Sequence, residues 1–286
     1  MRRSLLFMPG NNPAMLQNSD VFDSDAVIFD LEDAVSITEK DAARTLVSQY
    51  LSALKEAPPM EIVVRINGMD TVYYMEDLQT IVCDAIDTIM LPKARAEDLR
   101  RLDGLLSDIE KRKGMKKKIG VLPIVELAVS VLEIDEIAGC PRVSGVLLGA
   151  EDLSGDMDVV RTKQGNEILY ARMRIATACA AYKIDSIDTP FTDTNDAKGL
   201  EADCRYAANL GFCAKAAIHP NQVPVINDVF VPAAPQIRWA LRVEEASAQA
   251  ARKGLGVFSL DGKMVDKPVI QRAQKILAKA RKYNLI

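Results

Sequence analysis

Two carboxylates follow two apolar runs of the sequence and are the side chains best placed to do chemistry. Glu126 ends the run Ile119–Val125, and Asp152 follows the run Val143–Gly149. Such runs are typical of strands buried on both faces of a parallel sheet, whose carboxyl ends carry catalytic groups. Because hard divalent cations take oxygen ligands, the pair predicts a metal site that polarises a carbonyl or hydroxy-acid substrate. Alternatively, each acid caps the helix after its strand, and spacing does not decide whether Glu151 or Asp152 coordinates.

Three further acids and an arginine end two other strand-like runs. Asp30, Glu32 and Asp33 follow Ala26–Phe29, and Arg65 lies near the end of Glu61–Ile66. Three acids exceed the needs of a helix cap, so they are expected to order metal-bound waters or to supply a base. The guanidinium of Arg65 suits a bidentate clamp on a substrate carboxylate. A buried salt bridge to Glu32 and Asp33 is the structural alternative, because an unpaired charge inside a strand is costly.

Three other positions give weaker signals. The turn Pro9–Asn12 follows the first apolar run and is expected to expose backbone N–H groups to an anionic group. Lys93 follows Leu91-Pro92, and an ion pair with the acids is a simpler role for it than a Schiff base. His219 is the only histidine, and a structural role is the simpler interpretation. The five cysteines show no CxxC spacing, so they are interpreted as reduced thiols of a cytoplasmic protein and not as nucleophiles.

Strand-like and helix-like segments alternate along the chain. The predicted strands are 4–8, 26–31, 61–66, 88–91, 119–125, 143–148, 184–187 and 214–218. Apolar spacing of helical type predicts helices over 38–54, 96–113, 167–182 and 195–209. This alternation predicts a parallel sheet, and its length suits a TIM (β/α)₈ barrel over residues 1–220. An open doubly wound sheet is the alternative, although no GxGxxG follows the first strand.

The pattern changes after Pro220, where prolines precede a long predicted helix over 236–253. A hairpin around Asp261-Gly262 and a last helix over 267–283 follow. We therefore predict a C-terminal extension over 221–286 that is too small for a core of its own. It is expected to pack on the barrel or on a neighbouring subunit.

Bulk composition excludes several classes of protein. The 286 residues are 49% hydrophobic and 27% charged, which suits one large soluble core. The net charge of −4 lacks the basic footprint of a nucleic-acid-binding protein. No apolar run approaches the roughly 18 residues of a membrane span, and the N-terminal run is too short for a signal peptide.

The motifs together resemble the HpcH/HpaI-type, citrate lyase-like aldolase superfamily, and the tail over 254–266 looks closest to its citrate lyase β branch. The resemblance runs from residue 2 to about residue 280, and its matching motifs are Arg3–Gly10, Phe29–Val35, Val64–Asn67, Leu91–Lys93, Gly149–Asp152 and Gly262–Asp266. One departure lies beside Glu126, which is followed here by Leu127-Ala128 and in the family often by Thr or Ser-Pro.

The resemblance implies a site as well as a fold. It implies a TIM barrel that binds Mg²⁺ through Glu126 and Asp152, with Arg65 on the keto acid. It also implies that Asp266 reaches the site of a neighbouring subunit in a trimer or a multiple of one. Substrate contacts are then expected from Arg65, Glu126 and the turn residues Pro9 and Gly10. The expected catalytic residues are Arg65, Asp266 and an acid that holds a metal-bound water as base, either Glu32 or Asp33.

The implied reaction is retro-aldol cleavage of a citryl thioester on an acyl carrier protein, which yields oxaloacetate and the acetyl carrier. The implied partners are the α and γ subunits of a citrate lyase complex. Two alternatives stay open at this point. One is a stand-alone lyase for malyl-, citramalyl- or citryl-CoA, and the other is a non-catalytic scaffold subunit.

Overall fold

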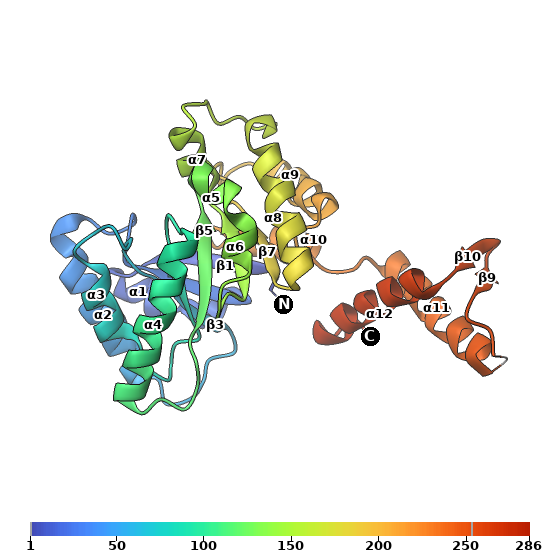
Figure 1. The fold of residues 1–286 in the computed structure, drawn as a ribbon, viewed down its shortest axis with the longest axis horizontal. Coiled ribbons are helices and arrows are strands. Elements are labelled where there is room, and N and C mark those ends of the chain that lie inside the picture. The colour runs from blue at the N-terminus through green and yellow to red at the C-terminus, as the bar shows by residue number, and fades with distance from the viewer. Residues whose placement is uncertain (1, 253) are drawn as a thin grey trace. The chain divides into compact units, whose positions relative to one another are not determined.

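The computed structural model describes residues 2–252 and 254–286. In these residues, eight parallel strands close into a barrel, in which β1 pairs with both β2 and β8. Figure 1 shows strands of this barrel with helices around them. The strands are β1 (Ser4–Pro9), β2 (Ala26–Asp30), β3 (Glu61–Arg65), β4 (Thr88–Leu91), β5 (Gly120–Val125), β6 (Gly145–Leu148), β7 (Asp185–Asp188) and β8 (Ala214–Ala217). The predicted TIM barrel is confirmed, and the open doubly wound sheet is wrong.

Helices follow the strands in turn and cover the outside of the barrel. The α-helices of this part are α1 (Pro13–Gln17), α2 (Lys40–Ala53), α3 (Tyr74–Ile81), α4 (Ala96–Lys113), α5 (Ala128–Leu132), α6 (Ile134–Ala138), α7 (Ala150–Asp156), α8 (Leu169–Tyr182), α9 (Ala197–Leu210) and α10 (Gln222–Val229), with 3₁₀ turns η1 (Ser19–Phe22), η2 (Ile37–Glu39) and η3 (Asn166–Ile168). Helix α4 matches its predicted range and ends at Gly114, whose φ of 63° suits glycine. The short helices were not predicted, because a turn or two of helix carries too little periodicity.

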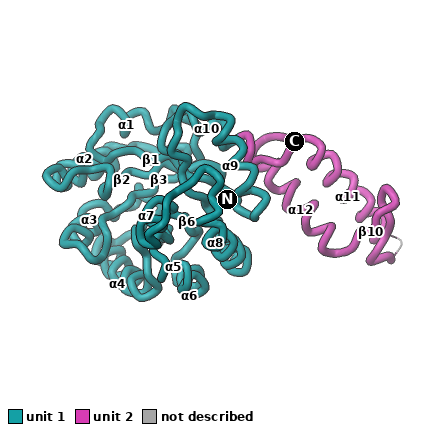
Figure 2. Tube along the Cα trace, turned by 90° about the horizontal axis from the view of Figure 1, so that it is seen from above, with its two compact units in different colours: residues 1–227 teal, residues 228–286 magenta. Residues whose placement is uncertain are grey.

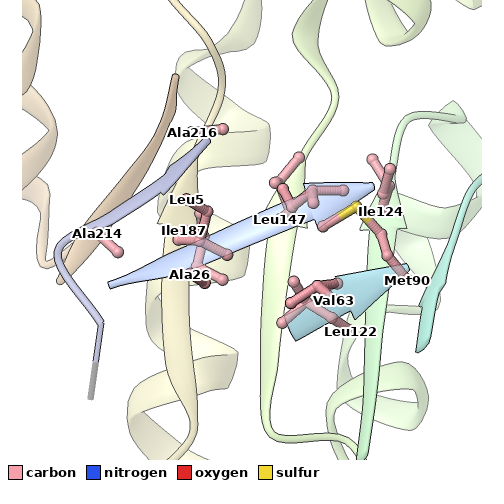
Figure 3. Packing of buried hydrophobic residues seen from close by; sticks show 11 residues of the cluster. Leu5, Ala26, Val63, Met90, Leu122, Ile124, Leu147, Ile187, Ala214 and Ala216 are labelled. Carbon is pink, nitrogen blue, oxygen red and sulfur yellow. The ribbon is translucent and has the colours of Figure 1, made fainter. Parts of the chain in front are cut away.

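Apolar side chains fill the interior of the barrel (Figure 3). They alternate along each strand with residues that face the helices, as strand geometry requires. The filling is uneven in size, since Ala26, Ala214 and Ala216 lie in the same cluster as Met90 and Leu122. The barrel is therefore a packed core and not a pore, so a ligand must bind at an end of it.

Gly10 lies where the end of β1 passes close to β2. A Cβ at this position would lie 2.7 Å from the backbone oxygen of Asp30, which β2 cannot easily move. We expect Gly10→Ala to lower the free energy of unfolding by about 1–3 kcal/mol, as overpacking does. The control is Gly104→Ala within α4, where a Cβ meets no atom within 4 Å and should stabilise by roughly 0.5–1 kcal/mol. Urea unfolding of both variants tests this, and equal stabilities would contradict it.

The chain divides into two compact units, residues 1–227 and 228–286 (Figure 2). The division falls later than the predicted boundary at residue 220. The second unit contains α11 (Ala234–Arg252), the hairpin strands β9 (Phe258–Leu260) and β10 (Lys263–Val265), and α12 (Lys267–Lys282). The end predicted for the first of these helices, Lys253, lies outside the described residues.

The second unit has a small apolar core, contrary to the sequence-based expectation. Helices α11 and α12 and the hairpin bury a common cluster of side chains, Ile237, Ala240, Val243, Val265, Ala273, Leu277 and Ala280. The segment was expected to be too short for a core of its own. That expectation is wrong because two long amphipathic helices can bury their apolar faces against each other. Its packing on a barrel or a neighbouring subunit stays a prediction. No helix of the described residues is long and apolar enough to cross a membrane.

Candidate active site

Strand register brings the acidic and basic residues together at the carboxyl end of the barrel. Asp30 at the end of β2 pairs directly with Arg65 at the end of β3. Likewise, Val125 of β5 pairs with Leu148 of β6, so Glu126 and Gly149 follow neighbouring strand ends. The groups singled out in the first unit therefore gather at one end of the sheet.

Asp30 is the main partner of Arg65. Its Oδ1 and Oδ2 accept hydrogen bonds from Nε and Nη2 of Arg65 at 2.7 and 2.6 Å. Arg65 Nη1 lies 2.9 Å from Glu32 Oε2 and 3.9 Å from Asp33 Oδ2. Burial alone would lower the pKa of Arg65, but the hydrogen bonds that it donates to Asp30 raise that pKa above its usual range. The buried ion pair offered as an alternative is present, and it also holds the guanidinium in one orientation.

The Nη1 end of the Arg65 guanidinium is the part that a ligand could reach. Asp30 occupies the Nε–Nη2 edge, and the Nη1 end is paired with Glu32, so a ligand carboxylate at this end would share Nη1 with Glu32. The guanidinium carbon lies 5.0 Å from the centre of the Phe7 ring, a cation–π contact that fixes its plane. A cavity of about 280 Å³ opens here, lined by Phe7, Pro9, Asp30 and Arg65 among others. The cavity can hold a small carboxylate beside Arg65.

Glu126 is buried and held by backbone groups. Its Oε1 accepts a hydrogen bond of 2.6 Å from the N–H of Lys93. Its Oε2 lies so close to Gly149 that a Cβ there would be 2.6 Å away. Burial raises the pKa of Glu126 to about 8; the Lys93 N–H opposes that rise, and the charges of Asp152 and Glu32 add to it. Three carboxylates thus share one electrostatic neighbourhood, which favours a cation.

Glu32 and Asp33 differ in their surroundings. Glu32 is 8% exposed, and burial raises its pKa to about 7, against the opposing charge of Arg65. The side chain of Asp33, in contrast, is 65% exposed. Buried Lys40 donates to the backbone oxygens of Leu31 and Glu32 at 2.8 and 2.6 Å, which holds the turn that carries Glu32. Lys40 is a supporting residue that the sequence did not indicate, because it lies in the predicted helix.

Neither of the two strand-end acids makes the capping hydrogen bond that the alternative interpretation required. Helix α5 has Leu127 as its N-cap residue and α7 has Gly149, and neither makes a side-chain cap hydrogen bond. Glu151 lies 3.5 Å from Arg161 as an ion pair. Asp152 is exposed in the first turn of α7, and its charge acts on Glu126. Glu126 therefore has no role at a helix end, whereas the charge of Asp152 is placed to act both on the N-terminus of α7 and on Glu126.

The donor set fits a hard dication that keeps water ligands. In residues 2–252 and 254–286, no group of three or more His, Cys, Asp or Glu residues could hold a metal by itself. Mg²⁺ needs no such group, because it commonly takes one or two carboxylates and completes its shell with waters and substrate oxygens. Glu126 with its raised pKa and Asp152 beside it supply two such oxygen donors.

The turn after β1 differs from its prediction. The N–H of Gly10 donates to the backbone oxygen of Asp30 at 2.8 Å, and that of Asn12 to Pro9 at 3.2 Å. The sequence had suggested that these two N–H groups would be exposed to an anion. They are instead used in hydrogen bonds within the protein. Pro9 instead lines the cavity beside Arg65. Glycine is needed at position 10 for close packing.

Lys93, His219 and Asp266 have contacts of their own. Lys93 makes no ion pair with the acids in the described part of the chain; its backbone N–H holds Glu126. His219 is exposed and accepts the N–H of Asn221 on Nδ1. Asp266 belongs to the second unit, where it is the N-cap of α12 and accepts from Val269 at 3.3 Å. Its role at a neighbouring site stays a prediction.

Comparison with known proteins assigns the chain to a family. The HpcH/HpaI aldolase/citrate lyase family matches residues 3–220. The chain is 40% identical to citrate lyase subunit beta of Leuconostoc mesenteroides subsp. cremoris, over 100% of this chain and 95% of that protein.

Two solved structures from Mycobacterium tuberculosis are also similar. Protein CitE in complex with magnesium, acetoacetate and coenzyme A has a TM-score of 0.78 and 30% identity, covering 98% of both chains. The citrate lyase beta subunit complexed with oxaloacetate and magnesium has a TM-score of 0.68 and 30% identity, covering 81% of this chain and 97% of that one.

Proposed function

Because the chain belongs to the HpcH/HpaI aldolase/citrate lyase family, we propose that it is a Mg²⁺-dependent carbon–carbon lyase that cleaves a citryl thioester on an acyl carrier protein. The products are oxaloacetate and the acetyl carrier. One observation carries the proposal: Glu126 is buried at the end of β5 and held by the Lys93 N–H, and its pKa is raised to about 8 by burial and by the charges of Asp152 and Glu32.

Glu126 and Asp152 would hold the metal, and the ion pair of Glu151 with Arg161 favours Asp152 over its neighbour. When bound, Mg²⁺ supplies positive charge to the hydroxyl and carboxylate oxygens of the substrate. The structure of a similar protein contains magnesium with oxaloacetate, which supports this assignment. The Lys93 N–H orients Oε1 of Glu126, and Oε2 would then be the oxygen that binds the metal.

Glu32 and Arg65 would carry out proton removal and substrate orientation. Glu32, with a pKa raised to about 7 by burial, is suited to take the hydroxyl proton near neutral pH. As the hydroxyl oxygen becomes the carbonyl of oxaloacetate, the carbon–carbon bond breaks and its electron pair forms the enolate of the acetyl thioester. Return of the proton taken from the hydroxyl to the enolate carbon completes the reaction, so that no proton is gained or lost overall. Arg65, fixed by Asp30, would hold the oxaloacetate carboxylate in register through its Nη1 end.

The test of the reaction is oxaloacetate release by the purified chain with Mg²⁺. Citryl-carrier and citryl-CoA thioesters are offered in parallel, and oxaloacetate is measured by NADH loss with malate dehydrogenase. We expect turnover with the carrier thioester. Turnover of CoA thioesters only would favour the stand-alone lyase, for which the coenzyme A complex of a similar protein is the supporting observation. Mg²⁺ binding without any turnover would favour a scaffold subunit.

Magnesium affinity is expected to depend on pH. The metal needs Glu126 ionised, but burial has raised its pKa to about 8, so binding below that pH must release a proton. The apparent association constant should therefore rise by up to about tenfold per pH unit below pH 8 and then level off. Calorimetry between pH 6 and 9 measures this. A constant affinity over that range would contradict the role of Glu126 as a ligand.

We further propose that the chain works in a multi-subunit citrate lyase complex with α and γ subunits, as a homotrimer or a multiple of one. Asp266 would then act in the site of a neighbouring copy. Asp266→Asn should lower activity without unfolding α12, because Asn caps a helix about as well as Asp. Mg²⁺ affinity should stay near normal.

Mixed oligomers give the sharper test of Asp266. Asp266→Asn and Glu126→Gln chains, dissociated and reassembled together, should regain some activity, since some sites receive both intact residues. Mixtures of each variant with itself are the controls. Verified hybrids without any regain would place Asp266 in its own chain's site or outside the site.

A further inference from the structure

Lys93 has a backbone conformation that its residue type does not favour. It follows β4 and Pro92, and its φ of 49° lies in the left-handed region. A lysine held there costs free energy, and such positions persist only where the surrounding structure enforces them. Here the conformation directs the N–H to Glu126 at 2.6 Å. The backbone therefore anchors Lys93 beside the proposed metal ligand.

The ammonium group of Lys93 is available. The side chain is exposed, and within residues 2–252 and 254–286 no carboxylate lies within the 4.0 Å of an ion pair. Other cations at this end of the barrel are engaged, since Arg95 pairs with Glu133 and Lys163 with Asp193. Burial raises the pKa of Glu32 to about 7, and the charge of Lys93 is among the groups that oppose that rise. The charge of Lys93 thus reaches the proposed site.

The proposed substrate needs one more cation than the site has so far supplied. The oxaloacetate part of a citryl thioester carries two carboxylates. One is next to the hydroxyl-bearing carbon, where Arg65 and the metal would bind it, and the other lies at the far end. We propose that the Lys93 ammonium binds this second carboxylate and so makes the site selective for dicarboxylate keto acids. This inference rests on the proposed function.

Asparagine is the informative replacement at position 93. It removes the ammonium but tolerates the left-handed conformation, so the N–H to Glu126 is kept. Lys93→Arg keeps a positive charge at nearly the same reach. Lys111→Asn is the matched control, because it makes the same change in net charge at an exposed position near the end of α4, toward the opposite end of the barrel.

The experiment compares Mg²⁺-dependent binding of oxaloacetate and pyruvate, which differ by the second carboxylate, by calorimetry. The wild-type protein should prefer oxaloacetate. Lys93→Asn should weaken oxaloacetate binding about two- to fivefold, the range of an exposed ion pair, and leave pyruvate binding and Mg²⁺ affinity nearly unchanged. Lys93→Arg should restore most of the preference, and Lys111→Asn should not alter it.

Several outcomes would overturn the assignment. An unchanged preference in Lys93→Asn, or an equal loss for both keto acids, would do so. Borohydride reduction in the presence of oxaloacetate would trap an imine if Lys93 were a Schiff-base residue, and a covalent adduct at Lys93 would also overturn it.

Failure of the proposed function is distinguishable. Equal wild-type affinities for the two keto acids with citryl-thioester cleavage intact would overturn only the role of Lys93. The expected preference without any cleavage would count only against the reaction. If neither keto acid binds with Mg²⁺, both are overturned.

Discussion

Glu126→Gln should abolish Mg²⁺-dependent cleavage without destabilising the protein. The substitution removes a proposed metal ligand, and loss of several kcal/mol of charge stabilisation corresponds to about 10³-fold or more in kcat/KM. Because burial raises the pKa of Glu126 to about 8, the ionised form is disfavoured in the fold. Stability should therefore fall as the pH rises from the usual range of a glutamate to about 8 in the wild type, and not in Glu126→Gln. At pH 8 the variant should melt at the same temperature or higher.

Asp152→Asn is the matched variant, since it removes an exposed carboxylate of the same proposed site. It should lose activity with little change in thermal stability at any pH. Steady-state kinetics over a Mg²⁺ titration and thermal unfolding at several pH values measure both effects. Full activity of the wild type in EDTA, or normal turnover by either variant, would contradict the proposed metal site.

Arg65→Lys should lower kcat/KM by an amount equivalent to about 2–4 kcal/mol, in the range for truncated buried charge pairs. Lysine keeps the charge but cannot make the fork that now binds Asp30 through two hydrogen bonds. It therefore cannot hold a substrate carboxylate in the same plane. Kinetics with the citryl thioester and direct binding of oxaloacetate report the loss.

Asp30→Asn separates the catalytic role of Arg65 from its structural role. It disturbs the same buried fork from the other side but leaves the guanidinium in place. If Arg65 serves only the fold, both variants should lose similar stability and keep wild-type activity at a temperature where they are folded. We expect Arg65→Lys to remain the weaker enzyme under those conditions. Equal kinetics of the two variants would count against the carboxylate clamp.

The sequence alone determined the barrel and the acids at its carboxyl end. Apolar runs at regular intervals specify buried parallel strands, and their boundaries differ from the structure by a residue or two, as for β3 and β5. The acids that follow these runs, Glu126 and Asp152 among them, must lie at one end of the sheet, because all strands of a parallel barrel end there. Local pattern was enough for these conclusions, since each depends only on the side chains within one segment.

The tertiary structure decided which of these groups meet. An ion pair of Arg65 with Glu32 and Asp33 was the structural alternative, and it is present. The sequence did not indicate the main partner, Asp30, which the register of β2 against β3 places directly beside Arg65. The turn after β1 was expected to leave its N–H groups free. Gly10 instead lies close to β2, and its N–H donates a hydrogen bond to the backbone oxygen of Asp30. The left-handed backbone at Lys93 could not be predicted, because the residue there is neither glycine nor asparagine. These contacts join segments far apart in the chain, and their geometry is set by closure of the barrel, which no local pattern encodes.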